Sequence, residues 1–129
     1  MAQNYTFNGS LSMTASSATG FTSTASQSFT LNITGVDQIA SGRIDVAHDG
    51  DSTIMAAPGH GRAIMVRNLD DTNYVTIYDG ASSATDPIGV LEPGEFLFTI
   101  IRGTGTTTAR ANTAAVTIEY FAVEIDSAA

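Results

Sequence analysis

Residues 63–80, AIMVRNLDDTNYVTIYDG, contain two largely apolar runs on either side of a polar turn. In both runs β-branched residues occupy every second position: Ile64 and Val66, then Val75 and Ile77. A period of two is typical of a β-strand that buries one face. Asp and Asn favour turns because their side chains hydrogen-bond to nearby backbone groups. The stretch therefore predicts a β-hairpin whose turn contains Asp70 and Asp71.

The same alternation continues on both sides of this stretch. Further strands are expected in FTLNITG (29–35), GRIDVA (42–47), EFLFTII (95–101) and AAVTIEYFAVEI (114–125). No run shows a helical stripe of useful length, and Gly-rich turns separate the short strands. The pattern predicts an all-β, single-domain β-sandwich or jelly-roll-like fold over residues 29–129.

The strand expected at 95–101 is apolar on both of its faces. Phe96, Phe98 and Ile100 alternate with Leu97, Thr99 and Ile101. A strand of this kind is expected to lie centrally, with other elements covering both sides. The preceding Pro93-Gly94 pair suits a type II turn, and Glu92 and Glu95 flank it.

The last strand changes phase at Tyr120. Val116 and Ile118 share one face with Tyr120, whereas the apolar residues that follow fall on the other face: Phe121, Val123 and Ile125. A bulge near Tyr120 would restore the register, and a fully buried strand or a partner on the second face would also explain the change. We therefore take Phe121, Val123 and Ile125 as candidates for an assembly interface.

Residues 1–28 differ in composition from the rest because they are rich in Ser, Thr, Ala and Gly. They are expected to form an extended N-terminal arm or a hairpin that can reach neighbouring subunits. A three-residue loop at 8–10 would place Phe7 opposite Leu11 and Tyr5 opposite Met13. Tyr5 and Phe7 are therefore further candidates for the assembly interface.

The formal net charge is −8, the sequence pI is near 4.3, and the chain contains no Lys. An acidic surface repels nucleic acid and anionic membranes, so neither is an expected partner. The first residues, MAQNYTFNGS, do not resemble a secretory signal. Synthesis in a cytoplasm is the expectation.

No motif predicts catalysis, a cofactor or a metal, and the chain is not expected to be an enzyme. Cys is absent, and the two histidines, His48 and His60, do not form the His-x-His cluster of a cupin metal site. HDGDS and LDDTN lack the acid spacing of a calcium loop. No Gly-x-Ser-x-Gly elbow is present, and the glutamates are explained by turns and strand surfaces.

The sequences VRNLDDTNYVTIY, VLEPGEFLFTI and ANTAAVTIEYFAVEI together resemble the small β-sandwich virion proteins of tailed bacteriophages, over about residues 60–125. The resemblance implies a capsid decoration (cement) protein. Such a protein would be a homotrimer bound to the major capsid protein on the exterior of the virion. Arg62 and Arg67 are candidates for contacts with an acidic capsid surface.

Other functions are compatible with the same residues. The chain could be a minor component of a phage neck, tail or fibre. It could also be a carbohydrate-binding adhesin module, with Tyr74 and Tyr78 exposed on the outer face of their strand to stack on sugars. A cupin-like enzyme would have to retain a metal.

Overall fold

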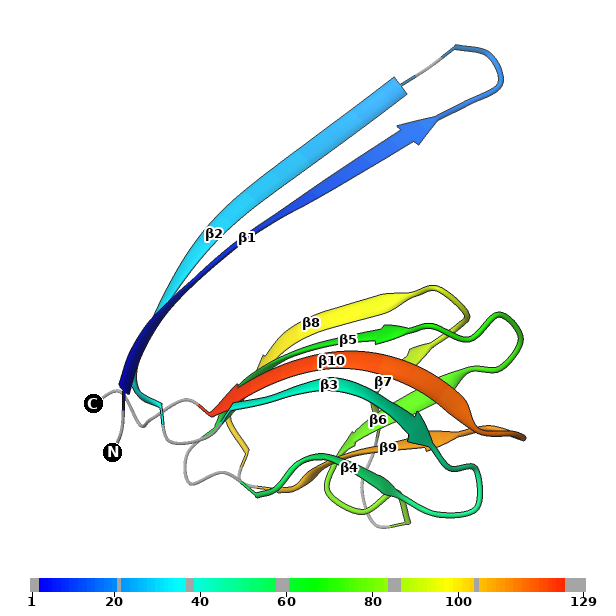
Figure 1. Cartoon of the computed structure of the whole chain (residues 1–129). Helices are drawn as coiled ribbons and strands as arrows, with labels where there is room; N and C mark the ends of the chain where they lie inside the picture. Colours follow the sequence, from blue (N-terminus) through cyan, green and yellow to red (C-terminus); the bar gives the residue numbers. More distant parts are fainter. Residues whose placement is uncertain are drawn as a thin grey trace.

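The computed structural model describes residues 3–20, 22–36, 39–57, 61–83, 87–103 and 105–124. These residues form ten β-strands and no helix, so none of them belongs to a helix that could span a membrane. The strands build one two-stranded sheet and two four-stranded sheets, which confirms the predicted all-β fold (Figure 1). The two larger sheets pack face to face as a β-sandwich.

The sheets of the sandwich are antiparallel. The first sheet has the order β3 (Ile39–Val46), β10 (Val116–Glu124), β5 (Arg62–Asn68), β8 (Phe96–Ile101). The second sheet has the order β4 (Ser52–Met55), β9 (Thr107–Ala111), β6 (Val75–Asp79), β7 (Pro87–Leu91). Every connection from β3 to β10 passes from one sheet to the other, except that between β6 and β7.

The core lies between the sheets and is formed by the alternate residues that face inward. The predicted inward residues Ile64, Val66, Val75 and Ile77 are fully buried there, as are Val116 and Ile118. Burial of one such side chain contributes about 1.5–3 kcal/mol. The period of two therefore identifies the faces of these strands correctly.

The segment between β5 and β6 is a turn, but the predicted hairpin is wrong. The Asp70 carboxylate accepts hydrogen bonds from the backbone N–H groups of Thr72 (3.0 Å) and Asn73 (2.6 Å). The two strands that the turn joins do not pair with each other, because β5 belongs to the first sheet and β6 to the second. The turn is a corner of the sandwich.

The expectation of a central strand at 95–101 is also wrong. β8 pairs with β5 and lies at the edge of the first sheet, and its residues Phe96, Phe98 and Ile100 are exposed. The preceding turn is as predicted, since Gly94 has a φ of 82° and the Glu95 N–H donates to the Glu92 carbonyl (3.0 Å). This turn also crosses between the sheets.

β10 contains no bulge near Tyr120. Its pairing with β3 and with β5 is continuous from Ile118 to Val123. The strand is apolar on both faces because Ala122 packs in the core while Phe121 and Val123 point to the opposite side. The change of phase therefore reflects a second apolar face.

The remaining strands, β1 (Gln3–Ser16) and β2 (Thr22–Val36), form a long antiparallel hairpin, called the hairpin below. Its turn lies at residues 17–20, where Gly20 has a φ of 92°. The predicted loop at 8–10 is wrong, because these residues pair with 28–30 in mid-strand. The predicted boundary between residues 28 and 29 lies inside β2, so 29–35 belong to the hairpin and not to the sandwich.

The hairpin projects from the sandwich on the side of the first sheet. Its base lies near the start of β3, and its distance from the sheet increases toward the tip (Figure 1). The register places Tyr5 opposite Ile33 and Phe7 opposite Leu31. The hairpin thus extends above the sheet without lying flat on it.

Candidate assembly surface

The side of the first sheet that points away from the core, called the outer face, carries an apolar cluster. Strand register aligns Phe121 of β10 with Met65 of β5, and Met65 with Phe98 of β8. Five large hydrophobic residues on this face are exposed, each with 40 % to 54 % of its surface accessible: Ile39, Met65, Phe96, Phe98 and Ile100. Such a cluster is unusual on the surface of a soluble monomer.

The outer face is apolar because two strands, β8 and β10, carry hydrophobic residues on both of their faces. In β8, Leu97 and Ile101 point inward and pack against the core, so Phe96, Phe98 and Ile100 must point outward. In β10 the same alternation directs Phe121 outward. Both strands thus supply hydrophobic residues to the core and to the outer face.

Charged residues border this cluster in equal numbers of each sign. Arg43 and Glu119 form an ion pair of 2.9 Å, and both are exposed. Arg67 lies next to Phe96 in the register, and Asp45 accepts a hydrogen bond from the Thr117 hydroxyl (2.7 Å). The charges of these two arginines and two acids cancel, whereas the whole chain carries −8.

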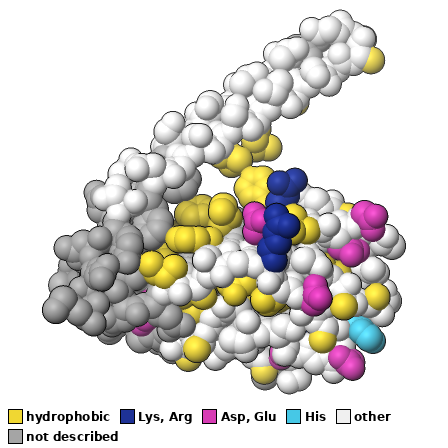
Figure 2. Space-filling view, viewed as in Figure 1, with side chains coloured by type: hydrophobic (Ala, Val, Ile, Leu, Met, Phe, Trp, Pro, Cys, Tyr) yellow, Lys and Arg dark blue, Asp and Glu magenta, His cyan; other side chains and the backbone are white. Residues whose placement is uncertain are grey.

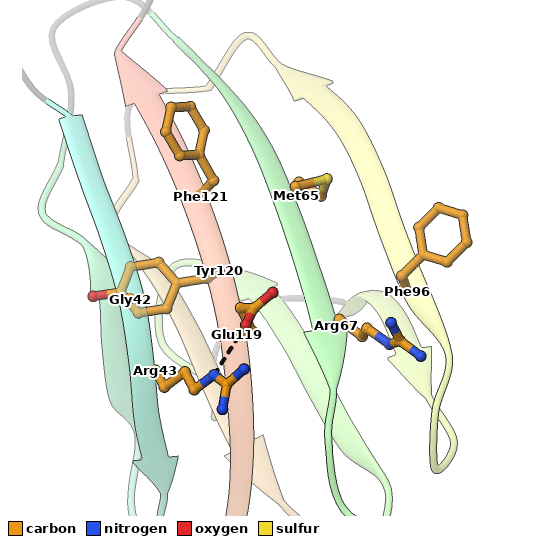
Figure 3. A pocket seen from close by; sticks show the side chains of 8 residues that line it. All are labelled: Gly42, Arg43, Met65, Arg67, Phe96, Glu119, Tyr120 and Phe121. Atoms are coloured by element: carbon orange, nitrogen blue, oxygen red, sulfur yellow. Dashed lines mark hydrogen bonds and ion pairs between the residues drawn. The ribbon is translucent and has the colours of Figure 1, made fainter. Parts of the chain in front are cut away.

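Part of this border is a cavity of about 590 Å³. Figure 3 shows Arg43 and Glu119 joined by their ion pair, with Arg67, Met65, Phe96 and Phe121 spread over the neighbouring strands. A cation, an anion and aromatic rings are therefore available within one shallow area.

A second cavity, of about 630 Å³, lies between the outer face and the hairpin and is called the groove below. The hairpin contributes Leu11 and Gln27, among others, and the sheet contributes residues of the apolar cluster, including Met65, Phe98 and Phe121. Figure 2 shows hydrophobic side chains gathered beneath the hairpin. The hairpin therefore leaves Met65, Phe96 and Phe98 of the outer face exposed.

The structure brings some of the predicted interface residues together. Phe121 and Arg67 both lie on the outer face. Val123 points to the same side and lines the groove, but only 1 % of it is accessible. Tyr5 and Phe7 lie in β1 of the hairpin. Ile125 and His60 lie outside the described residues.

The two tyrosines considered for sugar stacking differ in exposure. Tyr74 lies just before β6 and is 39 % accessible, whereas Tyr78 lies in β6 and is half-buried. Both are in the second sheet or its connection, away from the apolar cluster.

Arg62 is not available for contacts with a partner, contrary to the prediction. It shares the inward phase of Ile64 and is fully buried. Its guanidinium donates to the Asp79 carboxylate, to the Thr107 hydroxyl and to the Gly103 carbonyl (2.9 Å). These partners lie in the second sheet and the loop before β9, so Arg62 joins the two sheets of the sandwich.

Two glycines before β9, Gly103 and Gly105, make room for this ion pair. A Cβ atom on Gly103 would collide with the Asp79 carboxylate, and one on Gly105 would lie 2.6 Å from it. The glycines of this loop thus have a packing role beside Asp79.

Two carboxylates elsewhere in the described residues accept local hydrogen bonds. Backbone hydrogen bonds from Asn73 and then Thr72 lower the pKa of Asp70 below its ordinary value, and hydrogen bonds from Ser82 lower the pKa of Asp51. His48 has a backbone carbonyl that accepts a hydrogen bond from Arg110 (3.2 Å). Within the described ranges no three His, Asp or Glu residues gather as metal ligands.

Alternation in the sequence does not reveal most of the outer face. It places the exposed residues of β8 in a buried central strand, and it gives no reason to select Met65 for an interface. The signal that could identify this face is that β8 and β10 carry apolar residues on both of their faces. Such strands are expected to be covered on both sides, but in the single chain their outer side stays exposed.

Comparisons of the chain with protein-family models, with curated proteins and with solved structures find no match.

Proposed function

We propose that this protein is a structural subunit of a virion, a decoration protein that docks as an oligomer on the exterior of a phage head. One observation carries the proposal: an uncharged hairpin stands above an exposed, charge-balanced apolar face in a chain whose net charge is −8. Surfaces of this kind mark sites that another protein covers.

The hairpin supports an assembly role independently of the outer face. Residues 1–36 contain no Asp, Glu, Lys, Arg or His. An isolated two-stranded hairpin is marginally stable in water, and exposed strand edges are normally protected by charges or Pro. β1 and β2 have neither protection, which favours a hairpin that is completed by neighbouring protein.

The strand order supports the structural class. We interpret the orders β3-β10-β5-β8 and β4-β9-β6-β7 as a jelly roll, an architecture that occurs in viral capsid domains, lectins and cupins. Because one fold serves several functions, this order does not select among them. The resemblance of residues 60–125 to phage virion proteins favours a viral capsid role over a lectin or a cupin. The partners would be the major capsid protein and further copies of this chain.

The proposal is tested by counting this chain in density-banded particles from its source by mass spectrometry, relative to the most abundant shell protein. A ratio near one to one is the expected result. A few copies per particle would contradict head decoration and move the chain to the neck, tail or a fibre. Absence from the particles would overturn the virion role, and binding of glycans through Tyr74 and Tyr78 would then be tested.

A further inference from the structure

We propose that the outer face of the first sheet binds the hairpin of a second copy of this chain, so that neighbouring subunits are joined by their hairpins. The inference rests on the proposed function in so far as both require an assembly subunit. It adds the identity of the partner and the two surfaces that meet.

With the hairpin of the same chain present, part of the outer face stays exposed although Val123 is buried. Phe96 remains 54 % accessible and Phe98 41 % accessible with the hairpin present, and the groove of about 630 Å³ separates the two surfaces. Only two residues separate the end of β2 at Val36 from the start of β3 at Ile39. This short connection fixes the base of the hairpin beside the first sheet, while the tip stands away from it (Figure 1).

The hairpin is also longer than the surface beneath it. At about 3.4 Å per residue, the 14 residues of β1 span about 48 Å, whereas the six residues of β8 span about 20 Å. All described residues from 10 to 28 are exposed. Of the hairpin, only residues 8–11 and Gln27 line the groove, so the more distal described residues, 12–20 and 22–26, do not line it with the sheet of their own chain.

Charge favours a hairpin over a sandwich as the occupant. Two sandwiches brought face to face would place two net charges of −8 close together, because all charged residues lie after residue 36. The hairpin is uncharged, so it adds no charge repulsion where it meets the charge-balanced outer face and keeps the two sandwiches further apart. Each copy supplies one hairpin and one outer face, and such a heterologous contact closes into a ring when its rotation permits.

The exposed side chains of the hairpin suit the apolar cluster. Leu11 and Met13 lie two positions apart on β1, so they share one face of the hairpin, and they are 45 % and 67 % accessible. Unbranched Met adapts its shape to irregular apolar surfaces, and Phe96 and Phe98 offer such a surface. Burying these residues on a neighbour removes the largest exposed hydrophobic residues of both surfaces from water.

Crosslinking tests the proposal directly because the chain has no cysteine. Two single variants, Leu11→Cys and Phe98→Cys, are purified separately, mixed and treated with a short bismaleimide. The expected product is a covalent dimer that contains one chain of each variant, identified by mass spectrometry of the linked peptides. In the matched control Thr53→Cys replaces Phe98→Cys, since Thr53 is exposed on β4 of the other sheet.

Two results would overturn the proposal. The first is a yield of mixed dimer no higher than with the Thr53→Cys control. The second is a crosslink that forms only within one chain when both cysteines are placed in the same molecule. The positions are exposed, so the variants are expected to fold, and circular dichroism checks this.

Sedimentation of the purified chain provides the second readout. We expect an oligomer that Met13→Glu and Phe98→Glu each dissociate at least tenfold more readily than Thr53→Glu does. A chain that is monomeric at all accessible concentrations overturns the inference, even if particles carry it in high copy number. Conversely, a hairpin-linked oligomer that is absent from particles supports the inference and overturns the proposed function.

Discussion

Arg62 of β5 and Asp79 of β6 form an ion pair that links the two sheets of the sandwich. The guanidinium is fully buried, whereas the Asp79 side chain is 30 % accessible. Thr107 and Gly103 accept the other hydrogen bonds of Arg62. Each of the three nitrogens of the buried cation therefore has an acceptor, as a buried charge requires.

Removing either partner of this pair is expected to destabilise the fold, and Asp79→Asn more than Arg62→Met. Asp79→Asn leaves a buried cation without its counterion, at a cost of about 3–5 kcal/mol. Arg62→Met leaves a carboxylate that water can reach. Urea denaturation at pH 7 measures both changes in the free energy of unfolding. A smaller loss for Asp79→Asn than for Arg62→Met would contradict the assignment of the buried charge.

Asn68 joins the two corners of the sandwich that carry the Asp70 turn and the Pro93-Gly94 turn. Its side-chain amide donates to the carbonyls of Asn73 and Leu91 (2.9 Å each). Its side-chain oxygen accepts from the Asp70 N–H (2.8 Å), and its backbone pairs with Glu95 and Gly94. One buried residue therefore positions both loops.

Asn68→Ala is expected to lower the free energy of unfolding by about 2–3 kcal/mol, because it leaves buried backbone groups without partners. Asn73→Ala is the matched control. It removes a hydrogen bond at the surface, from the Thr113 hydroxyl (2.9 Å), and is expected to cost less than about 1 kcal/mol. Denaturant midpoints of both variants give the comparison, and equal losses would refute the special role of Asn68.

Asp70 is expected to make stability depend on pH. The N–H groups of Asn73 and Thr72 lower its pKa in the folded chain below the ordinary value of 3.8. A lowered pKa means that the ionised carboxylate stabilises the fold above pH 3.8 and that this contribution is lost as the pH falls through the folded-state pKa. Asp70→Asn should therefore be less stable than the unmodified chain at pH 7, and the difference should disappear at low pH. A constant difference between the urea midpoints of the two chains as the pH is lowered would exclude this contribution.

The sequence does not predict β4, β7 or β9. It predicts the other five strands of the sandwich and their inward residues, because alternation is a local property of the chain. It predicts the Asp70 turn and the Pro93-Gly94 turn for the same reason. Strand pairing is not predicted in this way, because a period of two shows which face of a strand is buried and not which strand lies beside it. Alternation therefore favours a hairpin at the Asp70 turn, which joins two sheets, and it favours a sandwich strand at 29–35, which pairs with β1.

The candidate surface is only partly predictable. Phe121 can be identified because it is apolar and lies on the opposite face of its strand from the inward Ile118. Phe96 and Phe98 cannot, because an apolar residue on an exposed face has the same local pattern as one in the core. The burial of Arg62 does carry a signal, since it shares the phase of the inward Ile64 while Arg67 does not.

Two glycines allow the cost of backbone strain to be distinguished from the cost of steric crowding. Gly94 has a φ of 82° and no atom within 4 Å of the position that a Cβ atom would take, so Gly94→Ala is expected to cost about 1–2 kcal/mol through strain alone. A Cβ atom on Gly103 would collide with the Asp79 carboxylate, so Gly103→Ala must displace Asp79 from Arg62. Both variants are therefore expected to be destabilised, for different reasons.

A double-mutant cycle distinguishes the two reasons. In an Asp79→Ala background the carboxylate is absent, so Gly103→Ala is expected to lose most of its additional cost, whereas Gly94→Ala should retain its cost. The free energies of unfolding of the single and double variants give the two coupling energies. Additive losses for Gly103→Ala and Asp79→Ala would show that the glycine does not serve the ion pair. Strong coupling would show that position 103 is a glycine because Asp79 must reach the buried Arg62 between the sheets.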